Sequence, residues 1–119
     1  MRWPTLVAVR GESMRPSLRN GDLAVAYPAD GCELVPGQIV LAPGMAGLVI
    51  HRLVAVGQYG GRLYCLTAGD ANRAVDRLAI PADAILGVVA HRLPGLGLLH
   101  LSWSHVWALG SGRSGASVK

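Results

Sequence analysis

The sequence contains no phenylalanine among its 119 residues, and aromatic residues make up only 5% of the chain. Hydrophobic residues nevertheless amount to 51%, so a core has to be built from leucine, valine, isoleucine and alanine. Charged residues are few, at 15%, and this balance excludes an intrinsically disordered chain. A chain of this length accommodates one domain with a substantial core and is too short for two.

Lysine is almost absent, because Lys119 is the only one among eleven basic residues. The arginines are spread singly along the chain, and the formal net charge is +4. Nucleic-acid-binding proteins gather their basic residues into a patch or stripe, so we expect no nucleic-acid partner. A scattered positive surface is also compatible with contact with anionic lipid head groups.

Cysteine is scarce as well, with only Cys32 and Cys65 present. Neither belongs to a CxxC motif or has a paired histidine ligand, so we expect no metal site. Cys65 lies in an apolar run that favours a buried thiol. The sequence leaves open whether the two cysteines form a disulfide.

Long hydrophobic runs are missing, and no signal peptide or uninterrupted spanning helix is recognisable. Leu96, Leu99 and Trp103 recur at helical spacing, which predicts a helix either docked on the domain or lying at a membrane interface. The last residues are rich in glycine and serine, which is typical of a flexible tail. The expected organisation is a domain over 1–92, an apolar segment over 93–109 and a tail over 110–119.

Turn residues divide the remaining sequence into short apolar runs that are typical of strands. The expected strands cover 23–27, 39–42, 48–56, 63–67 and 85–90. A Gly-Gly pair at 60–61 predicts a hairpin between the third and fourth of these runs. Only the N-terminal turn region and the C-terminal segment favour helix. The fold class is therefore mostly β, with strongly coiled antiparallel sheets and a C-terminal helix beside them.

Residues 11–16 read Gly-Glu-Ser-Met-Arg-Pro, which places Ser13 on a glycine-flanked turn. A seryl hydroxyl is a poor nucleophile, so it needs a base to accept its proton and donors to hold an oxyanion. Gly11 leaves room for a substrate carbonyl, and the Ser13 amide is a natural oxyanion donor. Met14, beside the serine, is expected to contact the substrate. Without partners, however, such a serine is an ordinary loop residue.

The strand expected over 48–56 carries His51 between apolar neighbours. Period-two alternation places Val49, His51 and Leu53 on one face of this strand. A histidine there needs a hydrogen-bond partner, and an isolated one is most simply a structural residue. The imidazole is also the side chain best suited to general-base catalysis near neutral pH, and a strand would hold it rigidly.

Two carboxylates follow the hairpin, at Asp70 and Asp76. Aspartates beside glycine are common in turns for purely local reasons. In the functional alternative, one carboxylate accepts a hydrogen bond from the ring of His51, and the other fixes the loop through backbone amides or through Arg73 and Arg77. The residue pattern alone does not say which carboxylate takes which role.

Taken together, these blocks resemble the type I signal peptidase family. In chain order, the matching stretches are 11–18, 21–22, 37–40, 50–53, 66–72, Asp76 and 85–87. They are most similar to the branch found in archaea, the endoplasmic reticulum and some Gram-positive bacteria, in which histidine replaces the lysine base. Many members carry a hydroxyl residue where this chain has Gly11, although glycine also occurs there in mitochondrial inner-membrane peptidases and in small maturation proteases.

The resemblance implies Ser13 as nucleophile, His51 as general base, Asp76 as third member and Asp70 as a supporting carboxylate. It implies a β-rich catalytic core that cleaves signal peptides or a dedicated precursor after small residues, with no metal or organic cofactor. It also implies association with a membrane surface or a membrane subunit.

The same residues are compatible with three other kinds of protein. Self-cleaving repressor domains share the serine motif, but they use a lysine base, and Lys119 lies in the tail. An inactive module of the same fold could hold an extended peptide as an added strand. A non-catalytic membrane-surface protein would act through Trp103, Trp107 and the scattered arginines.

Overall fold

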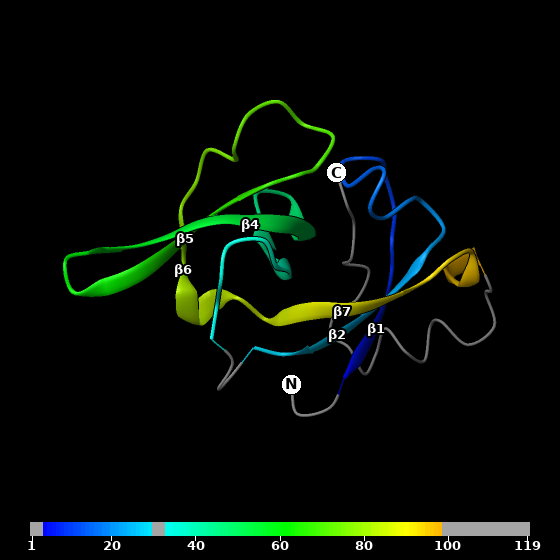
Figure 1. Ribbon diagram of the computed structural model, residues 1–119, viewed down its shortest axis with the longest axis horizontal. Coiled ribbons are helices and arrows are strands. Elements are labelled where there is room, and N and C mark those ends of the chain that lie inside the picture. Colours follow the sequence, from blue (N-terminus) through cyan, green and yellow to red (C-terminus); the bar gives the residue numbers. More distant parts are fainter. Residues whose placement is uncertain (1–3, 30–32, 99–119) are drawn as a thin grey trace.

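The computed structural model describes residues 4–29 and 33–98, which form one antiparallel sheet of seven strands (Figure 1). The strands lie in the order β1-β2-β7-β3-β4-β5-β6. They span Thr5–Ala8 (β1), Leu23–Pro28 (β2), Ile39–Gly44 (β3), Gly47–Tyr59 (β4), Arg62–Ala68 (β5), Ile80–Pro81 (β6) and Gly87–Leu93 (β7). The expectation of a mostly β domain is confirmed, but the described residues form a single continuous sheet rather than several.

Each run predicted as a strand contributes to the sheet, with ends that differ by a few residues. The last of them begins later than expected, at Gly87, and continues to Leu93. Two short strands were not predicted. β1 is only four residues long, too short to show a strand period, and β6 contains Pro81, which normally argues against a strand. β6 pairs only at the edge of the sheet, where the missing N–H of proline is tolerated.

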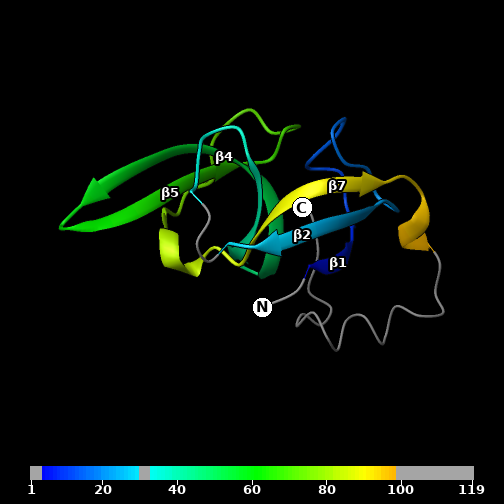
Figure 2. The same cartoon turned by 60° about the horizontal axis from the view of Figure 1, so that its bottom comes forward.

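The predicted hairpin is confirmed between β4 and β5, where Tyr59 pairs with Arg62. Gly60 and Gly61 turn the chain with φ values of 60° and 82°, a conformation that residues with a side chain seldom adopt. The two strands form an arm that extends well beyond β1, β2 and β7 (Figure 2). The predicted site residue His51 lies in the half of β4 that is farther from the turn of the arm.

The core is aliphatic, as the lack of phenylalanine requires, and it forms two clusters that share β4. Ile50 belongs to the first cluster and Leu53 to the second, as period-two alternation predicts. Cys65 is a buried free thiol whose pKa is raised by burial, whereas Cys32 lies outside the described residues. The first cluster consists of Val7, Val9, Met14, Leu18, Ala24, Leu41 and Ile50, and the second of Val40, Ala42, Leu53, Cys65, Ile80 and Ile85.

The helix expected over 93–109 is not seen where the structure describes this segment. Leu93 is the last residue of β7, and Leu96–Leu98 form a short 3-10 helix. Residues 99–119, including the expected tail, lie outside the described residues. Within the described ranges, no helix has the length and hydropathy needed to cross a membrane.

Candidate active site

Ser13 is presented by the loop that joins β1 to β2. The base of this loop is closed by two backbone hydrogen bonds, from the Val9 amide to the Asp22 carbonyl and from the Gly21 amide to the Val9 carbonyl, each 2.9 Å long. Leu18 packs into the first core cluster from within the loop. The position of Ser13 is therefore set by core packing as well as by the turn, and its side chain is buried, with 6% of the residue exposed.

Met14, expected to contact the substrate, is instead fully buried in the first core cluster. Its sulfur accepts a hydrogen bond from the amide of Asp70 at 3.4 Å. The expectation was wrong because a long apolar side chain gains more by filling the core beneath the loop than by facing solvent. Met14 anchors the loop of Ser13 and ties it to the loop that follows β5.

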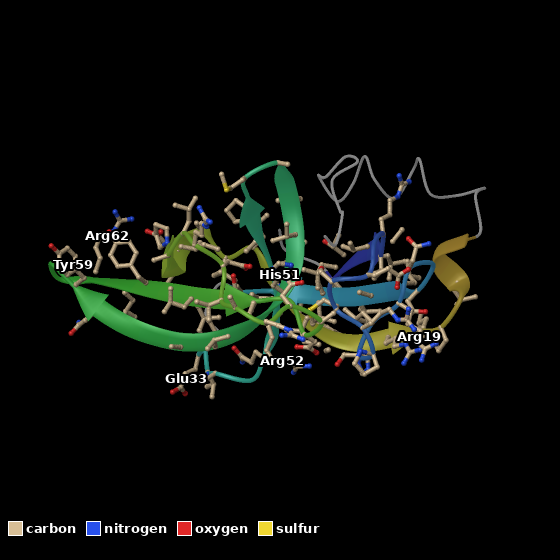
Figure 3. All side chains as sticks on the ribbon, turned by 90° about the horizontal axis from the view of Figure 1, so that it is seen from above. Arg19, Glu33, His51, Arg52, Tyr59 and Arg62 are labelled. Atoms are coloured by element: carbon tan, nitrogen blue, oxygen red, sulfur yellow. The ribbon has the colours of Figure 1, made fainter. Side chains whose placement is uncertain are left out.

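His51 lies in the inner half of β4, where it pairs with Val40 on β3. Only 6% of the residue is exposed. Figure 3 shows His51 near the middle of the molecule, with Arg52 on the other side of the strand, as alternation requires. The imidazole is thus held between neighbouring strands and faces the segments that carry Ser13 and Asp76.

Three side chains from separate segments form one hydrogen-bonded chain. The Oγ of Ser13 lies 3.3 Å from the Nε2 of His51. The Nδ1 of His51 lies 2.6 Å from the Oδ2 of Asp76. A carboxylate can only accept, so Nδ1 carries the proton, and Nε2 keeps a lone pair that faces the hydroxyl of Ser13. This tautomer is the one in which the imidazole can take a proton from the serine.

Thr67 is a further member of this site, and no residue pattern predicted it. Its hydroxyl donates to Oδ2 of Asp76 at 2.6 Å, the same oxygen that accepts from His51. Its carbonyl accepts from the Asp76 amide at 2.7 Å, and only 1% of the residue is exposed. A β-branched residue is ordinary in a strand such as β5, so the sequence carried no signal for this role.

Substituting Thr67 with valine, which keeps the shape and removes the hydroxyl, is expected to slow the reaction of Ser13 with a fluorophosphonate about tenfold. The physical reason is the loss of one hydrogen bond to a charged group that orients His51. Thr67→Ser, which restores the hydroxyl, should react at close to the original rate. Labelling rates followed by mass spectrometry measure both variants, and equal rates for the valine and serine variants would contradict the role.

Asp70 is held by a different set of partners. Arg52 binds it through two contacts, Nε to Oδ1 at 2.9 Å and Nη2 to Oδ2 at 2.7 Å, and Ser17 donates to Oδ2 at 2.6 Å. The loop was expected to be fixed through backbone amides or through Arg73 and Arg77, whereas Arg52 from β4 takes that role. The two-pronged geometry of a guanidinium matches a carboxylate better than a single contact does.

These contacts join three parts of the molecule. Ser17 belongs to the loop of Ser13, Arg52 to β4 and Asp70 to the loop after β5. The hydrogen bond from Arg52 holds the pKa of the Asp70 carboxyl below its usual value of 3.8, although partial burial acts in the opposite direction. The structure therefore places Asp76 against the imidazole and Asp70 in a supporting ion pair.

Replacing Asp70 with asparagine is expected to lower the free energy of unfolding near pH 7 by about 2 kcal/mol, less than for a fully buried pair because Arg52 is partly exposed. Since the folded pKa of Asp70 is lowered, its contribution is complete above the usual value and is lost as pH falls through the folded value. Urea unfolding curves of the original protein and the variant should therefore converge in acid. Asp83→Asn, at an exposed aspartate with a 3.5 Å ion pair, is the matched control and should change little.

Gly69 brings the loop after β5 against the backbone of Ser13. A Cβ at Gly69 would lie 2.6 Å from the Ser13 carbonyl oxygen, a distance that requires the backbone to move. The same carbonyl accepts a hydrogen bond from the Ala71 amide at 2.8 Å. The absence of a side chain at this position is what allows the two loops to meet.

Of the two predicted contributors to an oxyanion hole, Ser13 has the available donor. The amide of Gly11 donates to Oδ1 of Asn20 at 2.9 Å, and Gly11 adopts a φ of 87°. The amide of Ser13 makes no hydrogen bond to any other residue in the ranges 4–29 and 33–98. Gly11 therefore shapes the turn, whereas the N–H of Ser13 is not engaged by the described residues.

A groove of about 860 Å3 adjoins the hydrogen-bonded chain. One wall is the turn between β3 and β4 together with Val49, and the other is the whole segment 71–81. His51, Thr67 and Asp76 line it, whereas Ser13 does not. The volume falls in the range of pockets that hold small ligands or part of a peptide.

Within the described residues, no group of three or more histidine, cysteine, aspartate or glutamate side chains is arranged to hold a metal ion. Neither the models of known protein families nor the curated proteins match this chain. The functional assignment therefore depends on the geometry of the site and on the chemistry of its residues.

Proposed function

We propose that the protein is a serine endopeptidase of the signal peptidase I type. The observation that carries the proposal is the continuous path from Ser13 Oγ to His51 Nε2 and from His51 Nδ1 to Asp76 Oδ2, with distances of 3.3 Å and 2.6 Å. The two residues of the first pair are 38 positions apart in the sequence and those of the second pair are 25 apart, so both contacts depend on how the whole chain folds. A hydroxyl, an imidazole and a carboxylate in this order are the parts of an activated serine.

In the proposed reaction, Ser13 Oγ attacks a peptide carbonyl carbon while its proton passes to Nε2 of His51. The Ser13 amide donates to the oxyanion that forms, and Asp76 stabilises the imidazolium. The imidazolium then protonates the departing amine, so the peptide bond breaks and an ester on Ser13 remains. Water hydrolyses the ester with His51 again acting as base. The serine–histidine contact is long for a strong hydrogen bond, and such contacts often tighten only when substrate binds.

The sequence resemblance supports the finer part of the proposal. Its blocks include the turn of Ser13, the strand of His51 and the loop that contains Asp70 and Asp76. On this basis the expected substrate is a signal peptide or a dedicated precursor that is cut after a small side chain. The chemistry requires neither a metal nor an organic cofactor, and the protein would work at a membrane surface or beside a membrane subunit.

A fluorophosphonate probe tests the proposed nucleophile. The probe should attach to Ser13 in the folded protein, and peptide mapping by mass spectrometry should find no adduct on Ser17, whose hydroxyl donates to Asp70. Denatured protein is the control, because it contains the same serine without its base. Labelling of neither serine, or of native and denatured protein alike, would contradict an activated hydroxyl at Ser13.

The second candidate is a peptide-binding module of the same fold that does not cleave its ligand. It is favoured by one observation, that the groove is lined by His51 and Asp76 but not by Ser13, of which only 6% is exposed. A module of this kind would bind peptides with similar affinity before and after Ser13→Ala and would leave them intact. Incubation with a peptide library, followed by mass spectrometry of the products, separates the two functions.

A further inference from the structure

The segment 71–81 forms one whole wall of the groove and carries two arginines, Arg73 and Arg77. Both are exposed, and neither makes an ion pair or side-chain hydrogen bond with another residue of the described ranges. Apart from His51 and Asp76, they are the only ionisable side chains lining the groove within those ranges. Asp76 is hydrogen-bonded to His51 and Thr67, and no ion pair joins it to either arginine.

The carboxylates of the described residues are mostly engaged elsewhere. Four acidic side chains form an ion pair with an arginine, and the pairs are Glu12 with Arg15, Asp22 with Arg92, Asp70 with Arg52 and Asp83 with Arg62. Arg73 and Arg77, like Arg19, have no such partner within the described residues. They outnumber Asp76, the one carboxylate among the described lining residues, so an acidic group on an occupant would meet an excess of positive charge.

The rest of the groove is largely apolar, with Pro43, Val49, Leu78 and Ile80 among its lining residues. Low-dielectric walls concentrate the field of nearby charges and raise the local concentration of ligands with the opposite sign. A guanidinium also binds a carboxylate through two parallel hydrogen bonds. An occupant of matching chemistry has apolar side chains that contact these residues and at least one carboxylate that reaches the arginines.

We propose that the groove selects an extended, apolar stretch of polypeptide that carries an acidic side chain close to the cleavage site. This inference rests on the proposed function, because it identifies the groove beside His51 as the place where the substrate lies. Arg73 and Arg77 are the specificity determinants, and they act on binding rather than on the chemical step. Precursors with glutamate or aspartate at the matching position are preferred over neutral or basic ones.

A positional peptide set tests the preference. A neutral peptide with small residues at its centre is prepared with glutamine, glutamate or lysine at each flanking position in turn. Binding is measured on Ser13→Ala protein, which cannot cleave the peptides. With glutamate at one flanking position, or at either of two adjacent ones, the peptide should bind about fivefold more tightly than with glutamine there, as expected for a partly exposed ion pair. Lysine at the same position should weaken binding, and about 0.5 M salt should reduce the glutamate advantage. Fluorescence anisotropy measures these affinities, and kcat/KM on active protein follows the same order.

The double substitution Arg73→Gln and Arg77→Gln should abolish the glutamate advantage, so that the glutamate and glutamine peptides bind with equal affinity. Arg19→Gln controls for the loss of a positive charge outside the groove, because Arg19 is exposed, lies away from His51 (Figure 3) and is not a lining residue. Equal binding of the three peptides, or an advantage that survives the double substitution, would overturn the inference. So would loss of binding to anionic vesicles in the double variant with no effect on peptides, since the arginines would then serve a lipid surface.

The outcomes also separate this inference from the proposed function. Cleavage without any charge preference leaves the peptidase intact and rejects the role of the two arginines. A glutamate preference in binding, with no peptide cleaved by the original protein, rejects catalysis and retains the groove as an acidic-peptide site.

Discussion

Substituting Ser13 with alanine, or His51 with glutamine, is expected to reduce the rate of peptide cleavage by about a millionfold, the loss seen when a catalytic serine or its base is removed. Ser13→Ala removes the attacking oxygen, and His51→Gln removes the group that takes its proton. Because the two groups act as one unit, the double variant should be no slower than either single variant. Initial rates on a peptide identified from the library measure all three.

His91→Gln is the matched control for the histidine substitution. His91 is exposed, lies on β7 and makes an edge contact with the ring of Tyr27, so its loss should leave the rate unchanged. Thermal unfolding verifies that each variant is folded, which matters because His51 is buried within the sheet. Losses for Ser13 and His51 that multiply in the double variant would contradict a shared catalytic step.

The second large effect is expected for Asp76→Asn, with a loss of about 10⁴-fold in kcat, as when the carboxylate of a serine triad becomes an amide. An amide can donate to Nδ1 of His51, which favours the tautomer whose Nε2 carries the proton and cannot accept another from Ser13. Asp70→Asn leaves the imidazole and its carboxylate in place, so it should cost stability with a much smaller loss in kcat.

Steady-state kinetics of the two asparagine variants, measured at a temperature where both are folded, decides between these roles. KM should change less than kcat for Asp76→Asn, since the carboxylate is hydrogen-bonded to the imidazole and to Thr67. Thr67→Val removes one hydrogen bond to Asp76 without altering its charge, so its kcat should lie between those of the original protein and of Asp76→Asn. Equal losses for the two aspartates, or a larger one for Asp70, would exchange their roles.

The local structure of the chain was largely predictable from residue patterns. Alternation along β4 placed Ile50 and Leu53 on different faces, and the Gly60-Gly61 pair predicted the turn of the arm. β1 and β6 were missed, because four residues are too few to show a strand period and a proline-containing pair lacks a strand signal. Each forms through pairing with a neighbouring strand, which a sequence window does not contain.

The members of the site were predicted unevenly. Ser13, His51 and Asp76 are chemically distinctive and could be singled out, whereas Thr67 resembles any β-branched residue in a strand. The predicted substrate contact of Met14 was wrong, because its position next to Ser13 in the sequence does not say which way its side chain points. The loop packs it inward, where it fills the core and accepts a hydrogen bond from Asp70.

The sequence by itself determined the composition of the core, most of the strands and the chemical groups available for a serine site, because strand period, turn residues and side-chain chemistry are local properties. Only the tertiary structure decided that Asp76 faces the imidazole, that Asp70 pairs with Arg52, and that two arginines line the groove. These contacts join residues far apart in the chain. Their geometry follows from how the strands pair and how the loops pack against the core, and no short stretch of sequence contains that information.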